Sequence, residues 1–208
     1  MIIEQVLVTN MAVFCYLVVD EKTKSGVLID PAGDFSRIFE AVDRYGAEIK
    51  YVINTHGHPD HTSGNDHVMK KTGAPLLIHG NDLKFLGKEA AVKAVTFSGA
   101  DKSATAVLTL KDKDRISFGS TQLWVIHTPG HSEGGICLYG NGNLFTGDTL
   151  FTEGMGRTDF PGGSMKVLMD SIRNKILSLP DDTVIWPGHH YGRKPKSTVR
   201  EQKGFYLK

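Results

Sequence analysis

The sequence predicts a single α/β domain over residues 1–208. With 208 residues, of which 40% are hydrophobic and 23% charged, the chain can bury one sizeable core. Short apolar runs rich in β-branched residues alternate with stretches whose apolar residues recur at helical spacing. Several of the apolar runs also lead into turns that carry His or Asp. We therefore expect alternating strands and helices, with polar side chains gathered in the loops after the strands.

The first third of the chain has the clearest pattern. The apolar runs Val13–Val19 and Val27–Asp30 predict two strands joined by the polar turn Asp20–Gly26. Apolar residues at helical spacing predict a helix over Phe35–Tyr45. The next apolar run, Ile49–Asn54, predicts a buried strand.

The rest of the chain predicts further helices and a strand. The segment Phe97–Thr109 is rich in Ala, Ser, Thr and Gly and receives no assignment. One apolar face over Ser164–Leu177 predicts a covering helix with Ser164 as its N-cap. The other expected elements are a helix at Gly64–Lys71, a strand at Pro75–Ile78 and a helix at Asp82–Lys93.

The stretch THGHPDH, directly after the run Ile49–Asn54, is dense in metal-binding side chains. Two of its histidines are spaced at i and i+2, so in an extended segment they point toward one ion. Pro59 then bends the chain and turns the following Asp and His toward a neighbouring point. Imidazole and carboxylate are ligands that zinc, iron and manganese accept. The stretch therefore predicts part of a site for two adjacent ions, with candidate ligands His56, His58, Asp60 and His61.

Three later segments repeat the order of apolar strand, tight turn and candidate ligand. TPGHSEGG follows the run Leu123–Ile126 and contains His131, while LFTGDTLF contains Asp148. VIWPGHHY contains His189, which we prefer to His190 because its PGH pattern matches that of His131. The remaining histidines, His67, His79 and His127, have no partner pattern and receive no role.

The ordered motifs HxHxDH, PGH, GDTLF and PGH resemble those of the metallo-β-lactamase fold superfamily, within its short glyoxalase II-like branch. The resemblance runs from roughly Val27 to Lys203. It implies a four-layer αββα sandwich with the metals at one edge of the two sheets. It also implies a single domain over 1–208, without the C-terminal helical domain of full-length glyoxalase II enzymes.

The same resemblance implies a complete binuclear ligand set. Carried over residue by residue, it assigns His56, His58 and His131 to a first ion, Asp60, His61 and His189 to a second, and Asp148 to a bridge between them. Asp30 falls where the family has a structural Asp near the site. The expected cofactors are two divalent metal ions, zinc in the first place, with iron or manganese as alternatives.

The resemblance implies a metal-dependent hydrolase of a hydroxyacylglutathione-like thioester. A metal-bound hydroxide would attack the carbonyl carbon, and Asp60 and Asp148 are the expected catalytic residues. Arg157, in the GRTDF segment, is a candidate for binding a substrate carboxylate. The alternative for this residue is a structural ion pair with Asp159.

Two other functions stay open. The tail HHYGRKPKSTVREQK also resembles that of persulfide dioxygenases, in which a single iron is held by residues matching His56, His131 and Asp148. A non-catalytic metal-binding module is the more remote alternative, because structural zinc sites are usually closed clusters rich in Cys.

Composition limits the partners and the setting. The net charge of +1 predicts no nucleic-acid partner, and the absence of an apolar run of roughly eighteen residues predicts no membrane partner. A small-molecule thioester remains the expected partner, and the sequence gives no oligomeric state. The N-terminus lacks a signal-peptide pattern, and Cys15 and Cys137 lie in apolar contexts. We therefore expect no disulfide and a cytoplasmic setting.

Overall fold

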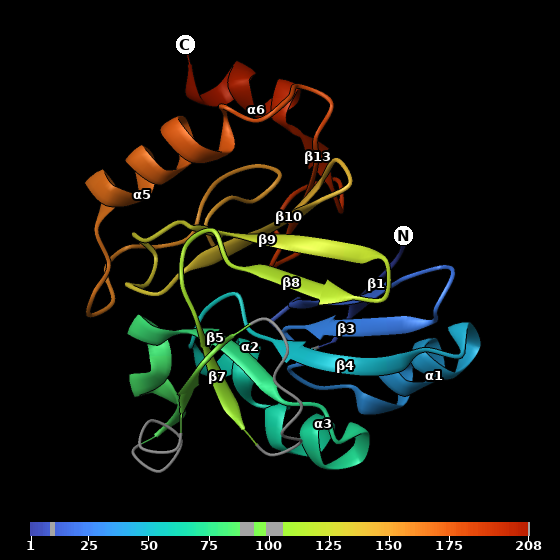
Figure 1. Ribbon diagram of the computed structural model, residues 1–208. Coiled ribbons are helices and arrows are strands. Elements are labelled where there is room, and N and C mark those ends of the chain that lie inside the picture. Colours follow the sequence, from blue (N-terminus) through green and yellow to red (C-terminus); the bar gives the residue numbers. More distant parts are fainter. Residues whose placement is uncertain (9–10, 88–93, 99–105, 208) are drawn as a thin grey trace.

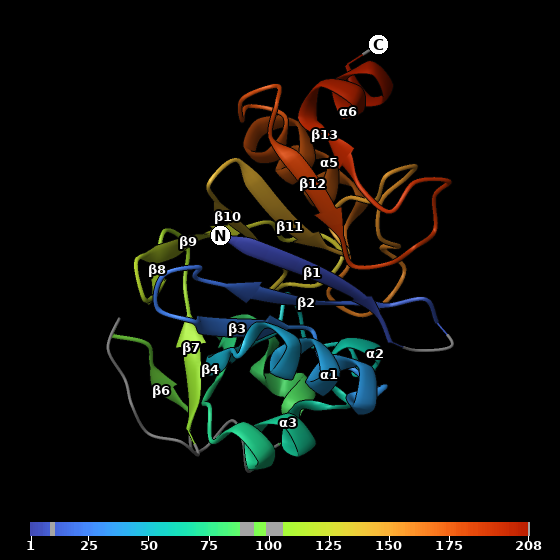
Figure 2. The ribbon, with the colours of Figure 1, turned by 90° about the vertical axis from the view of Figure 1, so that its right-hand side faces the viewer.

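Two β-sheets lie face to face, and helices cover the outer face of each (Figure 1). The computed structural model describes residues 1–8, 11–87, 94–98 and 106–207. From bottom to top in Figure 2, the layers are helices, sheet, sheet and helices. The predicted four-layer αββα sandwich is therefore confirmed.

The first sheet is built from the N-terminal half of the chain. Its three N-terminal strands are antiparallel, and the strands that follow run parallel to one another. The strands are β1 (Ile2–Leu7), β2 (Phe14–Val19), β3 (Ser25–Ile29), β4 (Glu48–Ile53), β5 (Leu76–His79), β6 (Val95–Thr96) and β7 (Val107–Leu110), in the order β1-β2-β3-β4-β5-β7-β6.

The second sheet is mostly antiparallel, with one parallel pair between β11 (Asn143–Gly147) and β12 (Val184–Pro187). That pair places the ends of two strands side by side. The other strands are β8 (Arg115–Phe118), β9 (Thr121–His127), β10 (Ile136–Gly140) and β13 (Ser197–Thr198), and the order is β13-β12-β11-β10-β9-β8.

The helices separate into two outer layers (Figure 2). α1 (Phe35–Tyr45) and α3 (Asn65–Thr72) lie on the first sheet, where α1 buries Ile38 and Val42. α5 (Met165–Ser171) continues into a π-helix, η2 (Ile172–Ile176), and lies on the second sheet with α6 (Val199–Tyr206). Two short elements lie in the loops, α2 (Pro59–Thr62) and the 3₁₀ helix η1 (Gly80–Leu86).

The main core lies between the two sheets. Tyr16 from β2, Ile53 from β4 and Phe145 from β11 are almost fully buried there. Burial of such apolar surface is the main favourable term in folding, at about 25 cal/mol for each Å². Because strands from both sheets contribute, the core fixes the two sheets against each other and thereby places the loops at their ends.

A buried carboxylate joins turns of the two sheets. Asp20, 2% exposed, accepts hydrogen bonds from the hydroxyls of Ser120 and Thr121 beside β9. It also accepts hydrogen bonds from the backbone and hydroxyl of Thr23 in its own turn. Hydrogen bonds from Ser120, Thr23 and Thr121 hold the pKa of Asp20 well below its ordinary value.

Most elements lie where the sequence predicts them. The helix Phe35–Tyr45 is confirmed with both bounds, and the side chain of Ser164 caps α5 as expected by accepting from the Val167 N–H. The helix expected over Asp82–Lys93 is wrong in its described part. There the chain forms the 3₁₀ helix η1, which ends at Leu86 and is followed by Gly87 with a φ of 89°; residues 88–93 lie outside the described part.

Two further differences concern strands. The strand expected over Val27–Asp30 ends at Ile29, because Asp30 has a φ of 51° and leaves the sheet. Within Phe97–Thr109, to which the sequence assigned nothing, β7 begins at Val107, and residues 99–105 lie outside the described part. Both cysteines are buried free thiols, as expected. Among the described helices, none is long and apolar enough to cross a bilayer.

Candidate metal centre

Loops at the ends of strands from both sheets bring all the predicted ligands to one edge. The loop after β4 carries two of the histidines, and α2 carries an Asp and a His directly behind them. The turns after β9, β11 and β12 add one side chain each. Together the cluster consists of His56, His58, Asp60, His61, His131, Asp148 and His189.

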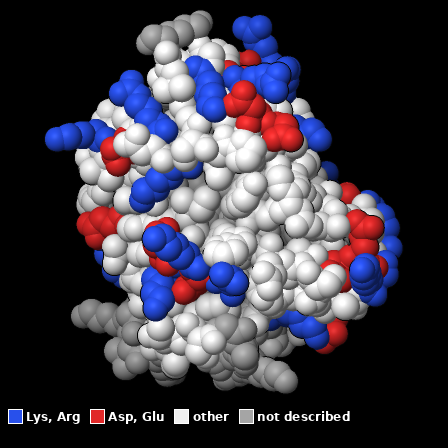
Figure 3. Space-filling model, turned by 45° about the horizontal axis from the view of Figure 1, so that its top comes forward, with Lys and Arg blue, Asp and Glu red and all other residues white. Residues whose placement is uncertain are grey.

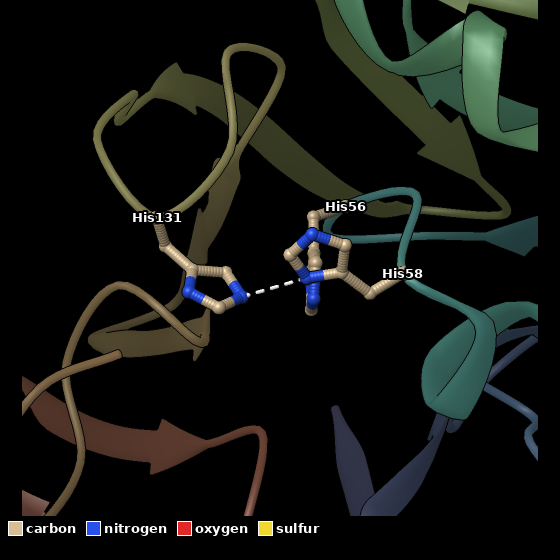
Figure 4. A group of neighbouring side chains, drawn as sticks. All are labelled: His56, His58 and His131. Atoms are coloured by element: carbon tan, nitrogen blue, oxygen red, sulfur yellow. Dashed lines mark hydrogen bonds between the residues drawn. The ribbon is translucent and has the colours of Figure 1, made fainter. Parts of the chain in front are cut away.

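The first group contains three imidazoles from two loops. His56 and His58 come from the loop after β4, and His131 comes from the β9–β10 loop that faces it (Figure 4). The Nδ1 of His58 lies 2.9 Å from the Nε2 of His131. One nitrogen of each ring lies within 4.8 Å of the others, so the three could bind a common ion.

The second group lies beside the first. Asp60, His61 and His189 each offer one atom within the same 4.8 Å limit. The Nε2 atoms of His61 and His189 are 3.1 Å apart, and Oδ2 of Asp60 lies 3.5 Å from the Nε2 of His189. Asp60 is the most open of these side chains, at 21% exposure, and it faces the adjoining cavity.

Asp148 lies between the two groups. Its Oδ1 is 3.3 Å from His61 Nε2, and its Oδ2 is 3.3 Å from His189 Nε2 and 3.5 Å from His131 Nε2. It also forms a third candidate group with His56 and His61. The geometry is that of a carboxylate able to contact ions on both sides.

The residues fit a bound cation. His56 Nε2 and Asp148 Oδ1 are buried without a hydrogen bond, and both belong to the cluster. Buried polar atoms are normally paired, because an unpaired one costs about 1–3 kcal/mol. Imidazole nitrogen and carboxylate oxygen are donors that divalent metals accept.

Hydrogen bonds on the far side of the rings fix which nitrogen faces the cluster. Carbonyl oxygens accept from the Nδ1–H of two rings: Arg157 O lies 2.7 Å from His131, and Met11 O lies 2.9 Å from His189. In the neutral form of each ring Nδ1 carries the proton, so the lone pair of Nε2 points into the cluster.

Asp30 is buried and supports two further rings, His61 directly and His56 through Thr55. Its Oδ2 lies 3.0 Å from His61 Nδ1 and accepts from the Thr55 hydroxyl at 2.7 Å. Since Thr55 donates its hydroxyl proton to Asp30, the Thr55 hydroxyl oxygen can accept a hydrogen bond from His56 Nδ1, 3.1 Å away. The structure therefore places Asp30 behind the ligands, where the family resemblance puts a structural Asp.

Sequence reasoning missed Asp82. This carboxylate, fully buried at the start of η1, accepts from Gly57 N–H at 2.9 Å, Ser132 Oγ at 2.7 Å and Gly134 N–H at 2.7 Å. It thus ties the loop that carries His58 to the loop that carries His131. No local pattern marks this role, because the partners lie far away in the sequence.

The GRTDF segment reaches the centre through its backbone. A Cβ on Gly156 would lie 2.0 Å from the Asp148 carbonyl oxygen and 2.8 Å from His131 Nδ1, so only glycine fits there. The Arg157 side chain forms a bidentate pair with Asp159 at 2.6 and 2.5 Å and lies over the Phe160 ring. The structural ion pair between Arg157 and Asp159 is therefore present. Contact of Arg157 with a substrate carboxylate stays a prediction.

Burial and neighbouring charges shift the titration of the cluster. Burial, helped by His61, lowers the pKa of His56 well below its ordinary value, so His56 is neutral and able to coordinate. Burial would also lower the pKa of His189, but Asp148 and Asp60 more than offset it and raise that pKa to about 9. In the same way burial would raise the pKa of Asp148, but His61 and His189 hold it well below its usual range. Without a cation, protons on the histidines stabilise the carboxylates.

A cavity of about 880 Å³ opens onto the cluster. It is bounded on the His58 side by Phe85 and Phe160 and on the His189 side by Phe151 and Tyr191. A cavity of this size suits a small-molecule ligand.

The other histidines lie outside the cluster, as expected. His190 is exposed and its ring lies against Phe14, so His189 is the member of the pair that enters the cluster. His67 stacks on Phe35, and His79 stacks on the ring of His127 at 4.1 Å.

The fold and the ligand cluster agree with a family comparison. The family model of the metallo-beta-lactamase superfamily matches residues 8–189. The chain therefore belongs to the metallo-beta-lactamase superfamily, whose members are mostly metal-dependent hydrolases that bind divalent metals.

Known relatives include enzymes of different activity. The chain is 34% identical to a probable hydroxyacylglutathione hydrolase of Schizosaccharomyces pombe, over 86% of this chain and 64% of the relative. It is 33% identical to the mitochondrial persulfide dioxygenase ETHE1 of Homo sapiens, over 91% of this chain and 68% of the relative. The solved structure of TTHA1623 in a di-iron-bound form matches with a TM-score of 0.77 at 28% identity, covering 96% of each chain.

Replacing the Asp82 carboxylate should loosen the centre. Asp82→Asn replaces one acceptor oxygen by an NH₂ group where three N–H and O–H donors now converge, so at least one donor from the two histidine loops loses its acceptor. We expect the affinity for Zn²⁺ to fall about 10- to 100-fold, the usual effect of removing a group that supports metal ligands. Competition with a chromogenic chelator measures it. Asp181→Asn, at an exposed ion pair with Lys203, is the control, and equal affinities in the two variants would refute the role of Asp82.

His79 makes folding stability depend on pH. Burial and the neighbouring His127 lower the pKa of His79 to about 4, whereas a histidine in an unfolded chain titrates near 6.5. Between these values the unfolded state binds more protons, so the free energy of unfolding should fall as the pH decreases from about 6.5 to about 4. The full shift corresponds to about 3 kcal/mol, which solvent screening at this site reduces to about 2 kcal/mol. Urea unfolding of metal-free protein at several pH values tests it. In His79→Asn this part of the pH dependence should vanish; an unchanged pH dependence would contradict the assignment.

Proposed function

We propose that the protein is a metal-dependent hydrolase of thioesters, with an acyl-glutathione type of substrate. The observation that carries this proposal is the position of Asp148 between two groups of three ligand atoms. A centre for two adjacent ions can both supply a nucleophile and polarise a carbonyl. The likeness to a probable hydroxyacylglutathione hydrolase supports the same reaction.

The residues that would hold the ions follow from the grouping. His56, His58 and His131 would bind one ion, Asp60, His61 and His189 the other, and Asp148 both. Zinc is the first choice for this set of nitrogen and oxygen donors, and iron and manganese suit it as well. A bound divalent ion lowers the pKa of its water to about 7 and polarises the substrate carbonyl.

The side chains around the ions orient the reactants. Asp60, which faces the cavity, accepts a hydrogen bond from the attacking water and keeps its lone pair directed at the carbonyl carbon. The water oxygen bonds to that carbon, the carbon–sulfur bond breaks, and its electron pair leaves on the sulfur. The products are a carboxylate, a thiol and one proton released to solvent. Asp30, Thr55 and the carbonyl oxygens behind the rings keep the imidazoles in place during these steps.

A persulfide dioxygenase of the same fold is the second candidate. The likeness to the human enzyme is as high as that to the hydrolase, at 33% against 34% identity. In that case one iron would be held by His56, His131 and Asp148, which leaves open positions for oxygen and substrate. Oxygen consumption with glutathione persulfide distinguishes this activity from hydrolysis.

A non-catalytic metal-binding module has less support. A cavity of about 880 Å³ opens onto the cluster, whereas structural sites are closed by their ligands. We place the enzyme in the cytoplasm, in keeping with its two buried free thiols. As partner we propose a small thioester rather than nucleic acid, because acidic and basic side chains lie side by side on the face drawn in Figure 3 without forming a continuous basic stripe among the described residues.

Loss of the bridging carboxylate should abolish hydrolysis. Asp148→Asn removes the negative charge between the two groups, so kcat/KM for lactoylglutathione should fall by more than about 100-fold in protein loaded with Zn²⁺. Circular dichroism checks that the fold is intact, and Asp181→Asn serves as the charge-matched surface control. Retention of full activity by Asp148→Asn would exclude the proposed mechanism.

A further inference from the structure

Three large apolar side chains line one side of the cavity. Met11, Phe151 and Tyr191, here named the Tyr191 wall, line it next to His189. The Phe151 ring contacts the Tyr191 ring edge-on with centroids 5.3 Å apart, and Tyr191 stacks on the His189 ring at 4.4 Å. Met11 and Tyr191 are each 54% exposed, while Phe151 is buried. Large apolar side chains gathered at the mouth of a cavity are typical of a ligand-binding surface.

The wall has a fixed position relative to the metal ligands. The Met11 carbonyl accepts the Nδ1 proton of His189, and the Phe151 and Tyr191 rings both lie against that same imidazole. The wall therefore adjoins the cluster, within reach of a substituent on a substrate carbonyl bound there.

The charges around the cavity differ on its two sides. On the wall side the charged lining residue outside the cluster is Glu153, which is exposed and forms an ion pair with Arg193 at 3.7 Å. An anionic substituent would meet this carboxylate and Asp60. The opposite side has the lining cations Lys84 and Arg157, each paired with an acidic residue. The His58 side thus combines the Phe85 and Phe160 rings with two paired cations, whereas no cation lines the cavity on the His189 side among the described residues.

We infer that the substrate carries an apolar acyl group that lies on the Tyr191 wall, while its thiol carrier extends past the His58 side. This inference rests on the proposed thioester hydrolysis and adds the chemical class of the acyl group. An unbranched or aromatic acyl chain buries its carbon atoms against Met11, Phe151 and Tyr191. Acyl groups with a terminal carboxylate are disfavoured by Glu153.

A series of thioesters of one neutral carrier, N-acetylcysteamine, tests the acyl preference in Zn²⁺-loaded protein. From acetyl through butanoyl to hexanoyl, kcat/KM should rise roughly threefold for each added methylene, in keeping with the free energy of burying a CH₂ group. Succinyl should react at least tenfold more slowly than butanoyl. A flat or falling series, or a succinyl thioester faster than the butanoyl one, would overturn the inference.

Variants locate the preference on the wall. Met11→Ser keeps the backbone carbonyl that holds His189, and it should lower kcat/KM for hexanoyl at least fivefold more than it lowers that for acetyl. Phe160→Ser, on the opposite side of the cavity, should keep the dependence on chain length. Phe205→Ser, an exposed residue on α6 outside this cavity, is the matched control. If Phe160→Ser removes the dependence and Met11→Ser does not, the assignment to the Tyr191 wall is wrong.

Binding without turnover separates the two proposals. Thioether analogues, with CH₂ in place of the carbonyl, cannot be hydrolysed, and calorimetry with metal-free protein should show affinity that rises with alkyl length and falls in Met11→Ser. If the analogues bind in this way but no thioester is hydrolysed, the Tyr191 wall is supported as a binding surface and the proposed reaction is refuted. If thioesters are hydrolysed without any dependence on chain length, the proposed reaction is supported and the Tyr191 wall is refuted as the acyl-binding surface.

Discussion

The close approach of imidazole nitrogens is the constraint on which the centre depends. The His61 and His189 Nε2 atoms lie 3.1 Å apart, and each ring has Nδ1 beside an acceptor on its far side. Two neutral rings held in this way direct lone pairs at each other, and such an arrangement is stable only when a proton or a metal cation lies between them. Without a metal, the raised pKa of His189 reflects the proton that its carboxylate neighbours favour. A divalent cation would satisfy both nitrogens and Asp148 together.

The fold keeps this arrangement in place through buried carboxylates behind the cluster. Asp30 fixes the chain leaving β4 through the Thr55 N–H and hydroxyl, and Asp82 ties that loop to the one after β9. Because Ser132 and Gly134 belong to a loop of the second sheet, the two sheets must be packed together for the cluster to form. The core between the sheets, around Tyr16 and Phe145, therefore acts on the chemistry by positioning the loops.

The sequence predicts those features that depend on residues close together in the chain. The candidate ligands were predictable because they follow apolar runs in short motifs, and the bounds of α1 because its apolar residues repeat at helical spacing. The role of Asp82 was not predictable, since it depends on Gly57 and Gly134, which approach Asp82 only in the folded chain. The same holds for the Tyr191 wall, whose members come from three separate loops. The helix expected to begin at Asp82 was wrong, because the chain instead forms a short 3₁₀ helix over Gly80–Leu86, in which the Asp82 carboxylate accepts hydrogen bonds from two distant loops.

Elemental analysis of the purified protein for zinc, iron and manganese tests the central claim most directly. Cells grown with all three metals available should yield protein with two divalent ions per chain, since Asp148 lies between two ligand groups. A single iron per chain would contradict a shared binuclear centre and would favour oxygen chemistry on His56, His131 and Asp148.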